Sequence, residues 1–178
     1  MPKGFNIKKF EQILHYIISK CADKPHVGKT VLYKLLYFSD FDFYELNESP
    51  LTGESYRKIT YGPAPCHFDD AIKKLKEEEK IREFHPKVGA HMQIKFLPIR
   101  EPELDLLGAS EIKHIDATIG KLSGMNANQV VAHTHKDMPV KATKEGCIID
   151  YELVFYRDDM FSVREYDDDC IQGSSRVC

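Results

Sequence analysis

The chain has 178 residues, of which 42% are hydrophobic and 30% charged, with a formal net charge of −3 at pH 7. This composition excludes an intrinsically disordered chain, and the length is that of one domain with a core of its own. The charge balance excludes a globally basic nucleic-acid or membrane-surface protein, although a local basic face is compatible with it.

The first third of the chain predicts two helices. Apolar residues recur at helical spacing over residues 7–22, and Asn6 is the expected N-cap of this amphipathic helix. In residues 28–46 the apolar side chains spread nearly around the whole helical circumference, which is typical of a central, buried helix. Asn47 and Pro50 are expected to end this second helix.

The middle of the chain predicts strands and a third helix. Residues 55–65 alternate weakly like a strand until the glycine and prolines at residues 62–65 favour a turn. Residues 66–81 carry apolar side chains on one face and Lys and Glu on the other, which indicates a helix with a solvated side. Residues 81–99 resemble a β-hairpin that turns near Pro86 and Gly89.

The last third predicts further helices. A fourth helix is expected from about Ser110 until Gly124, and Asn126 with Gln129 resembles a capping box for a short fifth one. Residues 147–161 fit either a helix or a strand, and we prefer a helix.

These elements predict a helix-rich α+β fold. A central buried helix is expected to be surrounded by about four or five further helices and by a small β-hairpin or short antiparallel sheet. One domain should cover residues 1–166, followed by a flexible acidic and polar tail at residues 167–178.

The segments at the ends of the chain and the cysteines favour a cytoplasmic protein. Residues 1–18 lack the features of a signal peptide, and no run approaches the roughly 20 apolar residues of a membrane span. The cysteines show no C-x-x-C spacing, so we interpret them as free thiols. They are Cys21, Cys66, Cys147, Cys170 and Cys178.

One short motif is weak evidence for nucleotide binding, and a second is weak evidence for catalysis. Residues 28–30 read Gly-Lys-Thr, but a phosphate-binding loop needs a glycine where Asp23 stands, so a helix start is the preferred interpretation. Cys66, His67 and Asp69 are sequence neighbours that point in different directions on a helix, which disfavours a nucleophile paired with a base. We therefore expect no enzyme, no catalytic residues and no cofactor.

Two polar clusters have ordinary structural explanations. His133, His135 and Asp137 would need a distant ligand, His114 or Cys147, to complete a metal site, so polar residues at a helix end are the preferred interpretation and we expect no metal. The Lys and Glu run at residues 73–80 is interpreted as a solvated helix face with i,i+4 pairs.

Three separate motifs occur in a fixed order. Residues 34–38 read K-L-L-Y-F, residues 50–53 read P-L-T-G, and residues 61–63 read Y-G-P. Together they resemble the Panacea domain, also called the SocA-like antitoxin domain, which is related to phage-associated prokaryotic proteins. The motif residues, to which we assign structural roles, are Lys34, Leu35, Leu36, Tyr37, Phe38, Thr52, Gly53, Tyr61, Gly62 and Pro63.

The resemblance is strongest between Leu32 and Leu75. Later in the chain, members of the family commonly have a histidine near a proline, and a tryptophan follows this proline. Here His133 or His135 precedes Pro139, and Val140 stands in the place of the tryptophan.

The resemblance implies an antitoxin of a toxin–antitoxin system. Such a protein binds a cognate toxin encoded nearby and blocks it directly, or delivers the toxin to a protease complex as an adaptor. Binding is expected to use exposed aromatic and charged side chains. The candidate toxin-binding residues, each of which also fits a packing role, are Tyr56, Arg57, Tyr61, Pro63, Phe84 and His85.

The main alternative is a DNA-binding regulator, because helices followed by a hairpin are typical of a winged-helix arrangement. Its phosphate contacts would come from Lys73, Lys74, Lys80, Arg82, Lys87 and Lys95. Nucleic acid therefore stays an open partner, and a membrane is not expected.

Overall fold

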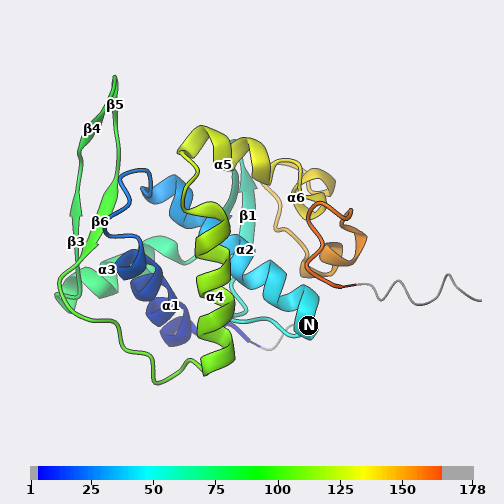
Figure 1. Cartoon of the computed structure of the whole chain (residues 1–178), viewed down its shortest axis with the longest axis horizontal. Helices are drawn as coiled ribbons and strands as arrows, with labels where there is room; N and C mark the ends of the chain where they lie inside the picture. Colours follow the sequence, from blue (N-terminus) through cyan, green and yellow to red (C-terminus); the bar gives the residue numbers. More distant parts are fainter. Residues whose placement is uncertain (1–3, 166–178) are drawn as a thin grey trace, which may run out of the picture.

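The central element of the fold is helix α2 (Lys29–Asn47), which runs through the middle of the molecule (Figure 1). The computed structural model describes residues 4–165. Gly28 is the N-cap of α2, and Glu48 ends the helix in the left-handed conformation. Three other helices, one strand and a C-terminal 3-10 helix pack against it, so α2 is buried on most sides, as predicted.

Two amphipathic helices cover one side of α2. Helix α1 (Ile7–Lys20) begins as predicted at Asn6, whose side chain accepts a hydrogen bond from the Lys9 backbone N–H at 3.1 Å. Helix α3 (Phe68–Glu77) packs on α1 with its apolar face, while its opposite face carries the predicted i,i+4 pairs of Lys and Glu.

A small sheet lies on another side of α2. Strand β1 (Tyr56–Ile59) pairs with β2 (Gly62–Pro65) in an antiparallel hairpin, so residues 62–65, predicted as a turn, form a strand instead. The prolines are tolerated because β2 is an edge strand that packs against α2. On its other edge, β1 pairs with the segment around Ile148, where the Ile149 N–H donates to the Tyr56 carbonyl at 2.8 Å.

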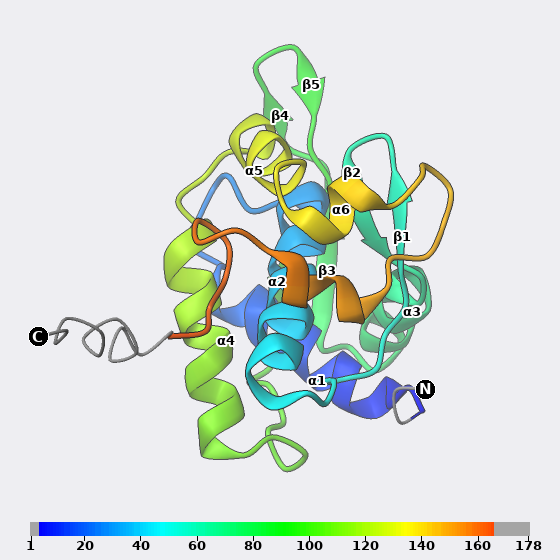
Figure 2. The same ribbon diagram turned by 90° about the vertical axis from the view of Figure 1, so that its right-hand side faces the viewer.

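The predicted hairpin over residues 81–99 is confirmed and forms a long arm. Strand β3 (Ile81–Phe84) pairs with β6 (Lys95–Pro98), and further out β4 (Lys87–Val88) pairs with β5 (His91–Met92). Figures 1 and 2 show the outer part of this arm projecting from the body, whereas β6 packs against α1 at its base.

The C-terminal part closes the fold around α2. Helices α4 (Ala109–Leu122) and α5 (Ala127–Thr134) lie close to the predicted positions, and the capping box at the start of α5 is present.

Two short elements follow α5. Helix α6 (Met138–Ala142) has Pro139 in its first turn, where a missing N–H costs nothing. Residues 147–161, for which we preferred a helix, pair with β1 at Ile148 and then form only the short 3-10 helix η1 (Tyr151–Tyr156).

The helix-rich α+β class is confirmed. Cys21, Cys66 and Cys147 are free thiols, whereas Cys170, Cys178 and the predicted tail lie outside the described residues. Within residues 4–165, no helix has the length and apolar character that crossing a bilayer requires.

Candidate functional site

Two of the three sequence motifs meet at Lys34, inside the protein. Lys34 lies on α2 and is fully buried, and its Nζ donates a hydrogen bond to the Pro63 carbonyl at 3.0 Å. Gly62 has a φ of +97° and lies so close that an added Cβ would be 3.3 Å from Lys34 Cε. Burial lowers the pKa of Lys34 to about 7, because the ammonium loses its hydration. The K-L-L-Y-F and Y-G-P motifs therefore form one packed unit.

The third motif is joined to the same helix through Asp40. Its carboxylate accepts hydrogen bonds from the Thr52 backbone N–H at 2.9 Å, the Thr52 hydroxyl at 2.8 Å and the Tyr56 hydroxyl at 2.5 Å. Burial raises the pKa of Asp40 to about 6, although the donors of Tyr56 and Thr52 oppose that shift. The P-L-T-G loop is thus anchored to α2.

A buried charge cluster, missed in the sequence, surrounds Arg157. Its guanidinium binds Asp137 at 2.8–2.9 Å, Asp42 at 2.7 Å and Glu45 at 2.8 Å. Tyr37 donates its hydroxyl proton to Asp137 at 2.8 Å. Burial lowers the pKa of Arg157, but the carboxylates of Asp42 and Asp137 outweigh it and raise the pKa above its ordinary value. The ion pairs of Arg157 therefore hold the segment after α6 against α2.

The Cys66 neighbourhood lacks the features of an activated nucleophile. Burial and the charge of Glu54 raise the pKa of the Cys66 thiol, whereas a reactive cysteine needs a lowered one. His67 Nδ1 lies 2.7 Å from Glu54 Oε1, and Asp69 pairs with Lys29 at 3.2 Å. His67 and Asp69, the hypothetical catalytic partners of Cys66, therefore interact with Glu54 and Lys29 instead.

The histidines near α6 are not arranged as metal ligands. The His133 ring packs against Phe38 and Phe161, and burial lowers its pKa. Asp137 is committed to Arg157 and Tyr37. Across residues 4–165, no group of three or more ligand-type side chains has the geometry to hold a metal ion.

The outward face of the small sheet exposes several apolar side chains. Because side chains alternate along a strand, Arg57 and Ile59 point outward while Tyr56 points into the core. Ile148 is the cross-strand partner of Arg57, so it shares the outward face. The exposed fractions are 37% for Ile59, 46% for Ile148 and 63% for Tyr61 in the turn between the strands. We call Arg57, Ile59, Tyr61 and Ile148 the outer β face.

The predicted toxin-binding residues do not form one surface. Tyr56 and Pro63 are buried, so their side chains belong to the core rather than to an exposed patch. Phe84 is the last residue of β3 and His85 follows it, on the arm, which lies apart from β1 in Figure 1. Among the six predicted residues, only Arg57 and Tyr61 belong to the outer β face.

Ile59 and Ile148 were missed in the sequence. Ile59 could have been found from the sequence, because it lies two residues after Arg57 on the same strand and therefore shares its face. Ile148 could not, because only its tertiary pairing with Arg57 brings it to this face.

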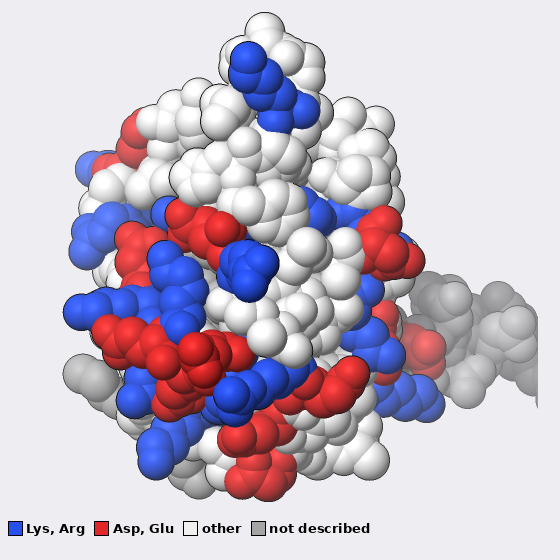
Figure 3. Space-filling view, turned by 90° about the vertical axis from the view of Figure 1, so that its left-hand side faces the viewer, with Lys and Arg blue, Asp and Glu red and all other residues white. Residues whose placement is uncertain are grey.

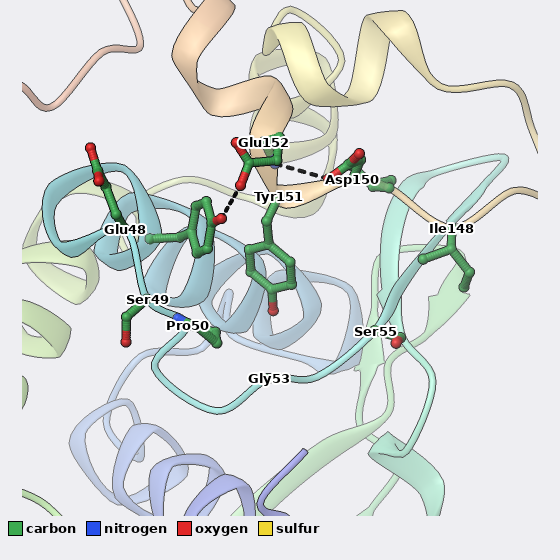
Figure 4. A pocket seen from close by; sticks show the side chains of 11 residues that line it. Glu48, Ser49, Pro50, Gly53, Ser55, Ile148, Asp150, Tyr151 and Glu152 are labelled. Atoms are coloured by element: carbon green, nitrogen blue, oxygen red, sulfur yellow. Dashed lines mark hydrogen bonds between the residues drawn. The ribbon is translucent and has the colours of Figure 1, made fainter. Parts of the chain in front are cut away.

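A pocket of about 630 Å³ adjoins the outer β face (Figure 4). Its walls are the last turn of α2, the loop that contains Pro50 and Gly53, and residues 148–152. Tyr44 donates its hydroxyl proton to Glu152, and this hydrogen bond raises the pKa of Tyr44 to about 12. Ile148 lines the pocket and also belongs to the outer β face, so the two features are continuous.

Most of the basic residues proposed for DNA contacts form ion pairs or hydrogen bonds within the protein. Lys73, Lys74 and Lys80 form ion pairs with glutamates, and Lys95 is buried with its Nζ on backbone carbonyls. Within the described part of the chain, Arg82 and Lys87 are without such an ion pair. Figure 3 shows Lys and Arg interleaved with Asp and Glu over this side of the molecule, which does not resemble a basic stripe.

Part of the chain matches a known protein family. A family model described as antitoxin SocA-like, Panacea domain, matches residues 32–139, more than half of the chain. The match begins within α2 and ends at Pro139 in α6, so it covers Lys34, Asp40, the β1–β2 hairpin, the arm, α4 and α5. No curated protein and no solved structure matches the chain.

Proposed function

Because this chain belongs to the SocA-like antitoxin family with a Panacea domain, we propose that it binds a protein toxin and neutralises it in a direct complex. The toxin is expected to be encoded nearby and to meet this protein in the cytoplasm. In this proposal the protein acts by occupying a surface of the toxin, and it is not an enzyme.

The outer β face is the observation that carries this proposal. Tyr61, Ile59 and Ile148 leave large apolar side chains in contact with water, beside the exposed side chain of Arg57, whose guanidinium donates a hydrogen bond to the Gly146 carbonyl. Aromatic and arginine side chains surrounded by apolar area supply most of the binding energy in protein interfaces. The hydrogen bonds of β1 to β2 and to residues 146–149 hold this face rigid, so little entropy is lost on binding.

The experiment is co-expression with neighbouring genes. Each neighbouring reading frame is induced alone and then together with this protein, while growth is followed and complexes are purified. We expect one neighbour to arrest growth and to be silenced and retained in stoichiometric amount. If no neighbour is toxic or retained, the proposal is wrong.

A pair of variants locates the interface. Tyr61→Ser with Ile148→Ser should weaken the complex at least about tenfold, since two apolar anchors are lost from it. The matched control is Ile99→Ser with Leu106→Ser, which removes side chains exposed at 52% and 39% from the connection that leads to α4. The control should bind like the parent protein.

The adaptor mechanism makes a different prediction. Direct inhibition requires the purified complex to be inactive without any protease, whereas an adaptor would lower the amount of toxin in the cell only while the protease is present. We propose direct inhibition, so purified toxin should lose its activity on addition of this protein alone.

A further inference from the structure

The pocket beside the outer β face is lined by acidic and aromatic groups. Glu48, Asp150 and Glu152 contribute carboxylates to its walls, and none of its lining residues is a lysine or arginine. The last turn of α2 also lies at this wall, and the C-terminal end of a helix carries partial negative charge. Cations are therefore favoured in the pocket.

The carboxylates keep acceptor capacity for a ligand. Glu152 uses Oε1 for the Tyr44 hydroxyl, and Asp150 uses Oδ1 for the backbone N–H of Glu152 at 3.0 Å. Their second oxygens have no hydrogen-bond partner within residues 4–165. Glu48 pairs at 3.1 Å with Arg164, a partly exposed residue that is not part of the lining. The excess of charge in the lining is thus negative.

The carboxylates add a preference for a flat cation. Tyr44 and Tyr151 line the pocket, but they are only 9% and 7% exposed and Tyr151 stacks on Phe41, so the rings contribute little open surface. Figure 4 shows the Tyr151 side chain pointing toward the loop at Gly53. A guanidinium binds carboxylates through two parallel hydrogen bonds, whereas an ammonium is a strongly hydrated point charge. Arginine therefore fits this lining better than lysine.

We propose that this pocket receives an arginine side chain of the partner protein, while an adjacent apolar residue of the same partner packs on the outer β face. The inference rests on the proposed function for the identity of the partner. Ile148 connects the two features, because it lies on the outer β face and at the rim of the pocket. A volume of about 630 Å³ accommodates an arginine together with part of its backbone.

A small-molecule probe tests the pocket without any toxin. We would titrate the protein with Nα-acetyl-arginine methylamide and follow backbone amide shifts by NMR. The amides of Gly53, Ser55 and Asp150 should shift saturably at millimolar concentrations, whereas the neutral isostere Nα-acetyl-citrulline methylamide should leave them unchanged. Equal responses to both compounds, or no response to either, would overturn the proposal.

A charge-neutral variant tests the role of the pocket in the complex. The pocket variant is Glu48→Gln with Asp150→Asn and Glu152→Gln. The amide introduced at position 150 can still cap η1, and the amide introduced at position 152 can still accept from the Tyr44 hydroxyl. The control variant, Asp23→Asn with Asp70→Asn and Glu77→Gln, changes the net charge equally at exposed sites away from the lining.

The two variants separate the hypotheses. The pocket variant should lose the response to the arginine probe, weaken the toxin complex at least about tenfold and reduce its salt dependence, while the control keeps all three properties. If the pocket variant binds toxin like the control, the pocket does not hold an arginine of the partner. If no toxin is found at all, the proposed function fails, but the probe titration still decides whether the pocket binds a guanidinium.

Discussion

Lys34 shows how a charged residue can be part of the core. Its stem packs inside the protein and its Nζ binds the Pro63 carbonyl, which is the one hydrogen-bond acceptor it has within the described residues. A buried ammonium is costly, so the folded state favours the neutral amine and the pKa falls from 10.5 to about 7. The unfolded chain therefore takes up a proton at a higher pH than the folded one.

This difference predicts a pH dependence of stability. Between the folded pKa of about 7 and the unfolded value of 10.5, the unfolded state binds more protons, so stability rises as pH rises. Relative to Lys34→Met, the parent protein should gain about 2 kcal/mol in the free energy of unfolding between about pH 7 and about pH 9. Urea denaturation at several pH values measures it. Lys73→Met, at an exposed position, should show no such difference, and a flat difference for Lys34→Met would contradict the assignment.

Arg157 is the second residue whose environment predicts a measurable effect. Its side chain is fully enclosed and neutralises part of the charge of three buried carboxylates, Asp42, Glu45 and Asp137. Arg157→Met would leave these carboxylates without a counter-ion, which should lower the free energy of unfolding by about 3–5 kcal/mol in urea denaturation.

Arg100 provides the comparison for this effect. It pairs at 3.7 Å with Glu79, and the two side chains are 61% and 78% exposed, so Arg100→Met should lower the free energy of unfolding by about 1 kcal/mol or less. Equal losses for the two arginine variants would show that the buried cluster contributes no more than a surface pair.

At the scale of elements, the β1–β2 hairpin depends on a single glycine. Gly62 adopts φ +97°, a conformation that side chains with a Cβ rarely reach, and an added Cβ would lie 3.3 Å from Lys34 Cε. The hairpin turn and the buried lysine are therefore coupled through this position.

Gly62→Ala should destabilise the protein by about 1–3 kcal/mol, because strain at positive φ adds to the close contact with Lys34. Thermal unfolding followed by circular dichroism measures the change. Gly120→Ala is the matched control, since Gly120 lies on an exposed part of α4 with nothing within 4 Å of an added Cβ. That control should stabilise the protein by about 0.5–1 kcal/mol through helix propensity. A neutral Gly62→Ala would mean that the turn relaxes freely.

At the scale of the whole molecule, residues beyond the family match complete the core. The match ends at residue 139, yet Tyr151 and Val154 are buried and the Tyr151 ring stacks on Phe41 at 4.3 Å. Arg157 adds its ion pairs to α2, and Figure 2 shows the segment that contains η1 crossing in front of α2.

A chain that ends at Cys147 should therefore lose cooperative folding. The truncation removes the apolar side chains that cover α2 and leaves its buried carboxylates without Arg157. The resulting loss in the free energy of unfolding should exceed the small net stability of a domain of this size. Thermal melting and the dispersion of amide NMR signals test this. A chain ending at Glu165 keeps every contact described above and should melt cooperatively. Cooperative melting of the shorter chain would show that the domain folds without residues 148–165.

Local patterns were sufficient to predict most elements. Asn6, the all-round apolar α2 and the capping box of Asn126 with Gln129 are signals that act within a few residues, so the helices were found close to their observed limits. The family followed from three short motifs, because their residues make contacts that few other side chains can replace. The strand β2 was misread, since its prolines indicate a turn unless an edge position beside α2 is known.

The candidate site depended on tertiary structure. Arg157 has no periodic signal in the sequence, and only folding brings it next to Asp42, Glu45 and Asp137 from more distant parts of the chain. The outer β face and its pocket join β1 to Ile148, which lies about 90 residues later. The first five helices and the family could be predicted from the sequence alone, because helix formation and turn chemistry are local. Which side chains are exposed together was decided only by the packing of distant segments.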